Sequence, residues 1–319
     1  MNISQDKIHL KVARDFGETF NVSIKFLRQN FVSFFTCLLL LAGPFVLLYS
    51  FTSAHHQAVI MEKTALVKSG RLYNMNIYTW EYFLSLLFQF ISYLSMICTT
   101  YSYIIVYSEK GKGNFTVADV AKKMNTNIGK IIGGFFLFFL LTIIFVVALF
   151  FIVGMIIQAS PILGGLLVFI LFIGFLLVGP NLLWQLNTAF LVILAEDEIP
   201  ISAYGRTRVV MKNNYWWTWL IVVCATFMVS LLSLLFVLPT SIYSLIHLYS
   251  NSSGEEGSSI LFTIISCICI FLATSVYSIF YIISTFHYFS LSEKTDGKGL
   301  LERINEIGNT QKNTVEQQF

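Results

Sequence analysis

Residues 131–195 contain no Lys, Arg, Asp or Glu, and this charge-free block limits the chain to folds that lipid can solvate. An α-helix rises about 1.5 Å per residue, so crossing a hydrocarbon layer about 30 Å thick takes about 20 apolar residues. The block is long enough for two crossings. Gln158, Ser160 and Pro161 give the one turn signal inside it, so we expect two membrane-spanning helices separated there.

The rest of the sequence has a similar character, because 56% of all residues are apolar, 12% are charged and the mean hydropathy is +0.74. Six stretches can cross a membrane: 31–53, 82–107, 131–157, 162–194, 217–249 and 259–289. The fourth is long, and a kink is expected at Pro180. We predict an all-α polytopic membrane protein with one six-helix transmembrane domain, 1–290. The tail, 291–319, is predicted to be partly helical and then disordered.

The distribution of Lys and Arg predicts the direction of the spans. Seventeen of the 20 lie in the N-terminal segment, the second and fourth connections and the tail. The other side holds only Lys63, Lys68 and Arg71. Because segments rich in Lys and Arg stay in the cytoplasm, both termini are predicted to be cytoplasmic. We predict a multi-pass protein of a bacterial inner membrane, with the lipid bilayer as its surroundings.

A repeat appears at the predicted cytoplasmic connections. The even-numbered spans end in YSEK, LAED and LSEK, which makes three glutamates equivalent: Glu109, Glu196 and Glu293. Amphipathic segments lead into the odd-numbered spans, and their gapless alignment matches three asparagines: Asn30, Asn127 and Asn214. We infer three units, about 17–110, 115–197 and 200–293. Each unit is an interfacial amphipathic helix followed by a transmembrane hairpin.

These matched residues have a structural and a functional interpretation. Each asparagine suits a helix cap or turn, and each glutamate can offset a helix N-terminus or pair with a basic side chain. The functional alternative is a ring of glutamate and arginine, with Arg206 and Arg208, that docks a protein partner at the cytoplasmic face.

The third cytoplasmic connection, LAEDEIPISAYGRTRVVMKNNYWWTWLIVV, covers residues 194–223. It resembles the membrane domain associated with bacterial glycerophosphoryl diester phosphodiesterases and related six-span bacterial proteins. The matching positions are Glu196, Arg206-Thr207, Asn214 and Trp216-Trp217, and Thr207 departs from the usual Ser. In some members a soluble catalytic barrel carries the activity, and such a barrel takes about 250 residues. Only about thirty residues follow the last span, so the resemblance transfers no enzyme activity.

The most polar stretch within a predicted span lies in the fourth. Asn181, Gln185 and Thr188 share one helix face. Hydrogen bonding between helices is the structural interpretation, and a polar groove for a lipid headgroup or another amphiphile is the functional one. Glycines in the third and fourth spans predict close packing between these two helices: Gly133-Gly134, Gly154, Gly164-Gly165 and Gly174.

No catalytic, cofactor-binding or metal-binding motif stands out, and the small net charge of +3 gives no reason to expect a nucleic-acid partner. We therefore expect no enzyme activity and no cofactor. The leading hypothesis is a non-catalytic membrane scaffold or accessory subunit of a bacterial inner-membrane assembly. The alternative is a lipid or amphiphile binding or transport protein that uses the polar face of the fourth span. The sequence leaves the oligomeric state open.

Overall fold

The computed structural model describes residues 8–68, 76–249 and 256–297, and most of the predicted tail lies outside these ranges. The described residues form helices and no strand. In chain order the helices are α1 (Phe16–Leu41), α2 (Gly43–Lys68), α3 (Trp80–Lys110), α4 (Val117–Thr126), α5 (Ile128–Ala159), α6 (Pro161–Glu196), α7 (Pro200–Met211), the 3-10 helix η1 (Lys212–Asn214), α8 (Tyr215–Tyr249), α9 (Glu256–Val276) and α10 (Ser278–Asp296). Six helical stretches are long and apolar enough to cross a membrane, which confirms the all-α class and the predicted number of spans.

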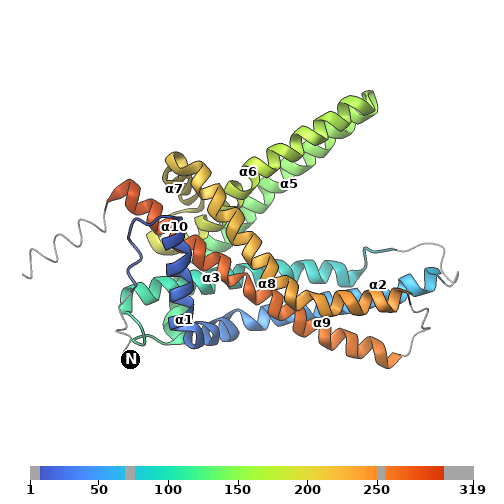
Figure 1. The fold of residues 1–319 in the computed structure, drawn as a ribbon, viewed down its shortest axis with the longest axis horizontal. Helices are drawn as coiled ribbons and strands as arrows, with labels where there is room; N and C mark the ends of the chain where they lie inside the picture. Colours follow the sequence, from blue (N-terminus) through green and yellow to red (C-terminus); the bar gives the residue numbers. More distant parts are fainter. Residues whose placement is uncertain (1–7, 69–75, 250–255, 298–319) are drawn as a thin grey trace, which may run out of the picture.

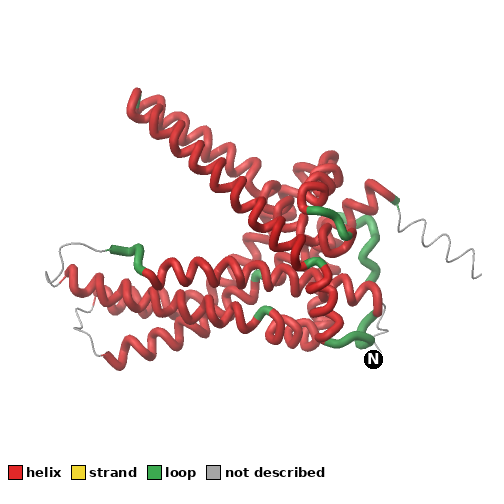
Figure 2. Tube along the Cα trace, turned by 180° about the vertical axis from the view of Figure 1, so that it is seen from behind, coloured by secondary structure: helices red, strands yellow, loops and turns green. Residues whose placement is uncertain are grey.

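Two arms leave a common junction in different directions (Figure 1). Helices α5 and α6 form one arm. Helices α2, α3, α8 and α9 run together as the other, where α2 packs on α3 and α9 and α8 packs on α9. Figure 2 shows the same division from behind. The junction holds α1, α4, α7 and α10. We call it the basic end because Lys and Arg gather in its short helices and at the helix ends that meet there, among them Lys110, Lys130, Arg206, Lys212 and Lys294.

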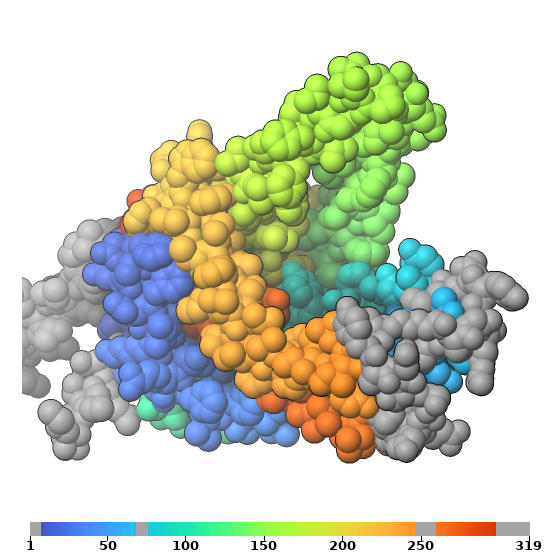
Figure 3. Space-filling model, turned by 45° about the vertical axis from the view of Figure 1, so that its right-hand side comes forward, coloured from blue at the N-terminus to red at the C-terminus, as the bar shows by residue number. Residues whose placement is uncertain are grey.

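The α5–α6 arm contains the turn that the sequence predicts. Helix α6 begins after Ser160, whose Oγ accepts a hydrogen bond from the Leu163 N–H at 3.5 Å, and Pro161 follows in the first turn. Away from its base, the arm leaves most of its apolar side chains open, and Phe150 and Phe169 are 71% and 60% exposed. Figure 3 shows the arm standing clear of the rest of the molecule. Lipid can solvate such a surface, and water cannot do so without large cost.

The first predicted span, 31–53, is wrong as a single helix. Helices α1 and α2 meet at Ala42, in the middle of that stretch. Pro44 explains the break, because proline has no N–H and its ring clashes with the carbonyl four residues earlier. The apolar helix long enough to cross a membrane here is Phe16–Leu41.

Helix α10 lies at the centre of the junction. It packs against α1, α3, α6, α7 and α8, and side chains on all of its faces are buried. His287 lies on α10 within this packed region. Its side chain is 1% exposed, and its Nε2 lies 3.0 Å from Oγ1 of Thr218 in α8.

The three-unit repeat stays a prediction. Helices α4 and α7 are short and precede the long helices α5 and α8, which fits two of the units. The first unit has no separate short helix, because α1 is continuous from Phe16 to Leu41. The helical part predicted for the tail beyond residue 297 lies outside the described residues.

Candidate functional site

Of the matched glutamates, Glu196 and Glu109 each form an ion pair with a basic side chain of the helix that follows. Glu196 ends α6, and its Oε2 lies 3.4 Å from Nε of Arg206 in α7. Glu109 lies near the end of α3, and its Oε1 lies 2.9 Å from Nζ of Lys123 in α4. Glu293 is buried within α10. The ion pairs of Glu196 and Glu109 each tie a long helix to the short helix that follows it.

Arg206 joins three helices of the junction. Its Nη1 donates to Oδ1 of Asp296 in α10 at 3.2 Å, and its Nη2 contacts Oδ2 of the same carboxylate. The Tyr288 hydroxyl of α10 also donates to Glu196, which closes a network across α6, α7 and α10. Arg208 is exposed and makes no hydrogen bond or ion pair with the described residues. Of the two arginines predicted at a docking surface, only Arg208 offers a free charge.

Two further ion pairs position the connections at the basic end. Lys110 Nζ lies 2.7 Å from Asp119 Oδ1, and Lys130 Nζ lies 2.7 Å from Asp197 Oδ1. Hydrogen bonds from Lys110 and from the Thr116 backbone N–H lower the pKa of Asp119 to about 2. The Lys130 hydrogen bond likewise lowers the pKa of Asp197. Solvent screens exposed pairs of this kind, so they orient the connections more than they stabilise the fold.

The three matched asparagines have different environments. Asn127 separates α4 from α5, and its Nδ2 donates to the Ile193 carbonyl of α6 at 3.2 Å. Asn214 ends η1, directly before α8. Asn30 lies inside α1 and its Nδ2 donates to the Phe26 carbonyl of the same helix at 3.0 Å. The predicted cap or turn role fits Asn127 and Asn214 and is wrong for Asn30.

The polar face predicted on the fourth span is buried in α6. Asn181 Nδ2 donates to the Tyr215 carbonyl at 3.2 Å, and Gln185 Nε2 lies 3.6 Å from Sδ of Met211. Thr188 is also buried, and its hydroxyl has no hydrogen-bond partner among the described residues. These contacts correspond to the interhelical interpretation. They fix α6 against the α7–η1–α8 connection.

Pro180 lies inside α6, and α8 supplies hydrogen-bond donors beside it. Proline leaves the carbonyl four residues earlier, that of Leu176, without its backbone N–H donor. Trp219 Nε1 donates to that carbonyl at 3.0 Å. The Tyr215 hydroxyl donates to the neighbouring Leu177 carbonyl, also at 3.0 Å. The start of α8 is therefore held against the middle of α6.

The segment before α1 is a part of the junction that no sequence signal indicates. The Arg14 N–H donates to Ser290 Oγ of α10 at 2.8 Å, and Ser290 Oγ donates back to the Arg14 carbonyl at 3.2 Å. Lys294 Nζ donates to the same carbonyl at 2.9 Å. The Arg14 guanidinium lies over the Phe286 ring, 5.5 Å from its centroid. These contacts place Lys294 beside the N-terminal segment.

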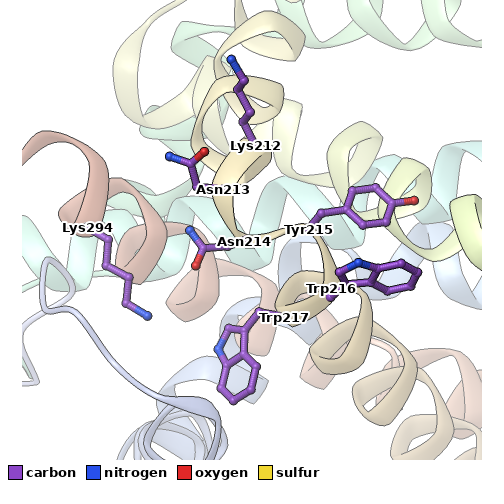
Figure 4. A pocket seen from close by; sticks show the side chains of 7 residues that line it. All are labelled: Lys212, Asn213, Asn214, Tyr215, Trp216, Trp217 and Lys294. Atoms are coloured by element: carbon purple, nitrogen blue, oxygen red, sulfur yellow. The ribbon is translucent and has the colours of Figure 1, made fainter.

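A pocket of about 540 Å³ opens where η1 meets α8, lined by residues 212–217 and by Lys294 of α10. In Figure 4 the side chains of Asn214, Trp217 and Lys294 surround one space. Neither Lys212 nor Lys294 pairs with a carboxylate of the described residues. The pocket thus combines free positive charge with amide and indole groups. The run KNNYWW carries this chemistry in the sequence, but Lys294 joins it only through the fold.

A second cavity, of about 360 Å³, lies between α2, α8 and α9 in the other arm. Hydroxyl side chains form much of its wall: Ser53, Ser233, Thr240, Ser241 and Ser244. Ser233 Oγ donates to the Ala273 carbonyl of α9 at 3.2 Å, which links two of its walls. Asn181 and Gln185 line neither of these two cavities.

Among the residues with described positions, no group of three or more His, Cys, Asp or Glu side chains could hold a metal ion. Comparison with protein-family models, curated proteins and solved structures finds no match for this chain. The six long apolar helices define the class, a multi-pass helical membrane protein.

Proposed function

We propose that this protein is a non-catalytic scaffold or accessory subunit of a bacterial inner-membrane assembly, and that the α5–α6 arm binds its protein partner. The exposure of that arm is the observation that carries the proposal. Only Ile131 and Gly134 of α5 are buried, and both lie near its base. The arm stands clear of the other helices (Figure 3), and most of its apolar side chains are exposed.

Glycines on the arm support a helical partner over lipid alone. The sequence suggests that these glycines bring α5 and α6 together, and Gly164 does lie against Ile157 of α5. Gly154, Gly165 and Gly174 instead face open space, with no atom within 4 Å of an added Cβ. Glycine inside a helix costs about 0.5–1 kcal/mol relative to alanine. Transmembrane helices recover such a cost where small residues let a second backbone approach closely.

The proposed orientation places the basic end in the cytoplasm. It rests on the excess of Lys and Arg in the connections gathered there. A reporter enzyme that is active only outside the cytoplasm, fused after Phe319, should then stay inactive. Activity of that fusion would overturn the orientation and leave the arm proposal standing.

Photo-crosslinking in native cells tests the partner arm. A photoreactive amino acid replaces Phe150 or Phe169 on the arm, and Phe51 of α2 or Leu235 of α8 serve as matched exposed apolar controls. The arm positions should yield a discrete crosslinked protein band that the controls lack. Crosslinks to lipid alone from both arm positions, or equal protein bands from arm and control positions, would contradict the proposal.

The second candidate function is binding of an amphiphile in the cavity between α2, α8 and α9. Its hydroxyl lining is the observation in favour, because such groups can bind a polar headgroup within the membrane-spanning part. Native mass spectrometry should then show a retained small molecule that Ser241→Phe removes by filling the cavity. Asn181→Leu should leave it bound, because Asn181 does not line this cavity. Retention by Ser241→Phe would exclude this site.

A further inference from the structure

We propose that the pocket at the start of α8 binds the phosphate group of an anionic phospholipid. The site lies at the basic end, where apolar helix α8 begins, which is the level at which headgroups meet a membrane protein. This inference is independent of the partner proposed for the α5–α6 arm.

The charges of the pocket suit an anion. Lys212 and Lys294 are exposed and line it from different elements, η1 and α10. In Figure 4 the Lys294 side chain turns toward Trp217, whereas the Lys212 side chain extends into solvent beside the pocket. Lys294 donates one hydrogen bond to the Arg14 carbonyl, and its ammonium group has two further N–H donors for a ligand. No carboxylate among the described residues neutralises either lysine. Two lysines on one site raise the affinity for anionic lipid over zwitterionic lipid.

The uncharged groups of the pocket suit a lipid better than a free ion. Asn214 offers an amide N–H to a phosphate or glycerol oxygen, and no described residue uses it. Trp217 and the 64% exposed Trp216 give the amphipathic rings that prefer the headgroup region. Exposed apolar side chains continue along α8 away from the pocket, at Leu220 and Phe227. A headgroup in the pocket can therefore extend its acyl chains along α8.

The position of the pocket depends on the contacts already described. Asn181 holds the Tyr215 carbonyl, and Trp219 holds α8 to α6 at Leu176. Arg14 fixes Lys294 on the opposite side. The polar face of α6, for which a lipid-binding groove is the alternative interpretation of the sequence, thus supports the wall of this site from behind.

Native mass spectrometry of the full chain tests the site by titration with phosphatidylglycerol. Replacing both lysines (Lys212→Gln with Lys294→Gln) should weaken binding about tenfold or more. Asn214→Leu should weaken it severalfold with the charge retained. The matched control removes two exposed lysines outside the pocket (Lys112→Gln with Lys122→Gln) and should bind like the parent. Each variant must first give the parent's thermal unfolding profile in detergent, and a destabilised variant is replaced by the single substitution Lys212→Gln.

Competing ligands separate lipid from free phosphate. Phosphatidylcholine carries a phosphate without net charge and should bind more weakly than phosphatidylglycerol. Glycerol phosphate and inorganic phosphate at the same concentration should not displace the lipid. Equal binding of phosphatidylcholine, displacement by soluble phosphate, or equal loss in the control variant would each overturn the proposal.

Discussion

The indole Nε1 of Trp219 in α8 donates a hydrogen bond to the Leu176 carbonyl of α6, four residues before Pro180. A proline inside a helix leaves that carbonyl without its usual donor, and lipid offers no replacement. Trp219 supplies the donor, so the hydrogen bond that Pro180 removes within α6 is replaced by one that joins α6 to α8. The same contact keeps the start of α8, and with it the basic pocket, in position.

A double-mutant cycle checks this link. Trp219→Phe should lower the free energy of unfolding in mixed micelles by about 1–3 kcal/mol, because a carbonyl in an apolar setting loses its donor. In a Pro180→Ala background the backbone N–H of residue 180 becomes available to Leu176. Trp219→Phe should then cost clearly less, with a coupling of about 1 kcal/mol or more. Equal costs in both backgrounds would show that Trp219 acts only by packing.

Replacing two adjacent glycines of the arm by alanine should have opposite effects on the free energy of unfolding. A Cβ on Gly164 would lie 2.8 Å from Cα of Ile157, too close for a backbone to accommodate without movement. Gly164→Ala should therefore lower the free energy of unfolding by about 1–3 kcal/mol. A Cβ on Gly165 meets nothing within 4 Å, so Gly165→Ala should be neutral or stabilising by about 0.5–1 kcal/mol. Similar effects of the two substitutions would contradict the packing of α5 on α6 at this turn.

Arg206 and Arg208 form a second matched pair. Arg206→Ala removes the two-point contact with Asp296 and the ion pair with Glu196, and should cost about 1.5–3 kcal/mol. Arg208→Ala removes the same charge from an exposed side chain and should change stability by less than about 0.5 kcal/mol. Chemical unfolding of both variants in the same micelles makes the comparison. Comparable losses of stability in the two variants would mean that the change in net charge, and not the loss of the α7–α10 contact, destabilises Arg206→Ala.

Several features of the fold could be predicted because they depend on local composition. The charge-free block could only be apolar helix, and Ser160 with Pro161 gave the turn between α5 and α6. Pairing with a basic residue is one of the two structural roles predicted for Glu109 and Glu196, from their place between a long helix and a short basic one, and both form such a pair. These inferences needed no knowledge of distant contacts.

The other features of the fold and the site depend on which helices pack together, and a local sequence pattern does not predict that packing. Asn30 and Asn127 look equivalent in an alignment, yet one bonds within its own helix and the other reaches α6. In α10 the sequence is that of an ordinary span, whereas the helices packed around it bury His287. Lys294 and residues 212–217 are about eighty positions apart, so the pocket they form is visible only in the fold.

The carboxyl group of Asp119 should titrate well below an ordinary aspartate. Its pKa is about 2 against an ordinary 3.8, because it accepts hydrogen bonds from Lys110 and from the Thr116 N–H. Since the folded state lowers this pKa, the ionised carboxylate stabilises the start of α4 above about pH 3.8, and that contribution is lost as the pH falls toward about 2.

Carbon-13 NMR of carboxyl-labelled protein in micelles would give the titration midpoint of Asp119, with Asp119→Asn assigning the signal. Lys110→Gln should raise the midpoint toward 3.8, whereas Lys112→Gln, two residues on and outside the pair, should leave it unchanged. A midpoint that does not move in Lys110→Gln would show that the backbone N–H alone lowers the pKa, and that the link from α3 to α4 does not depend on this ion pair.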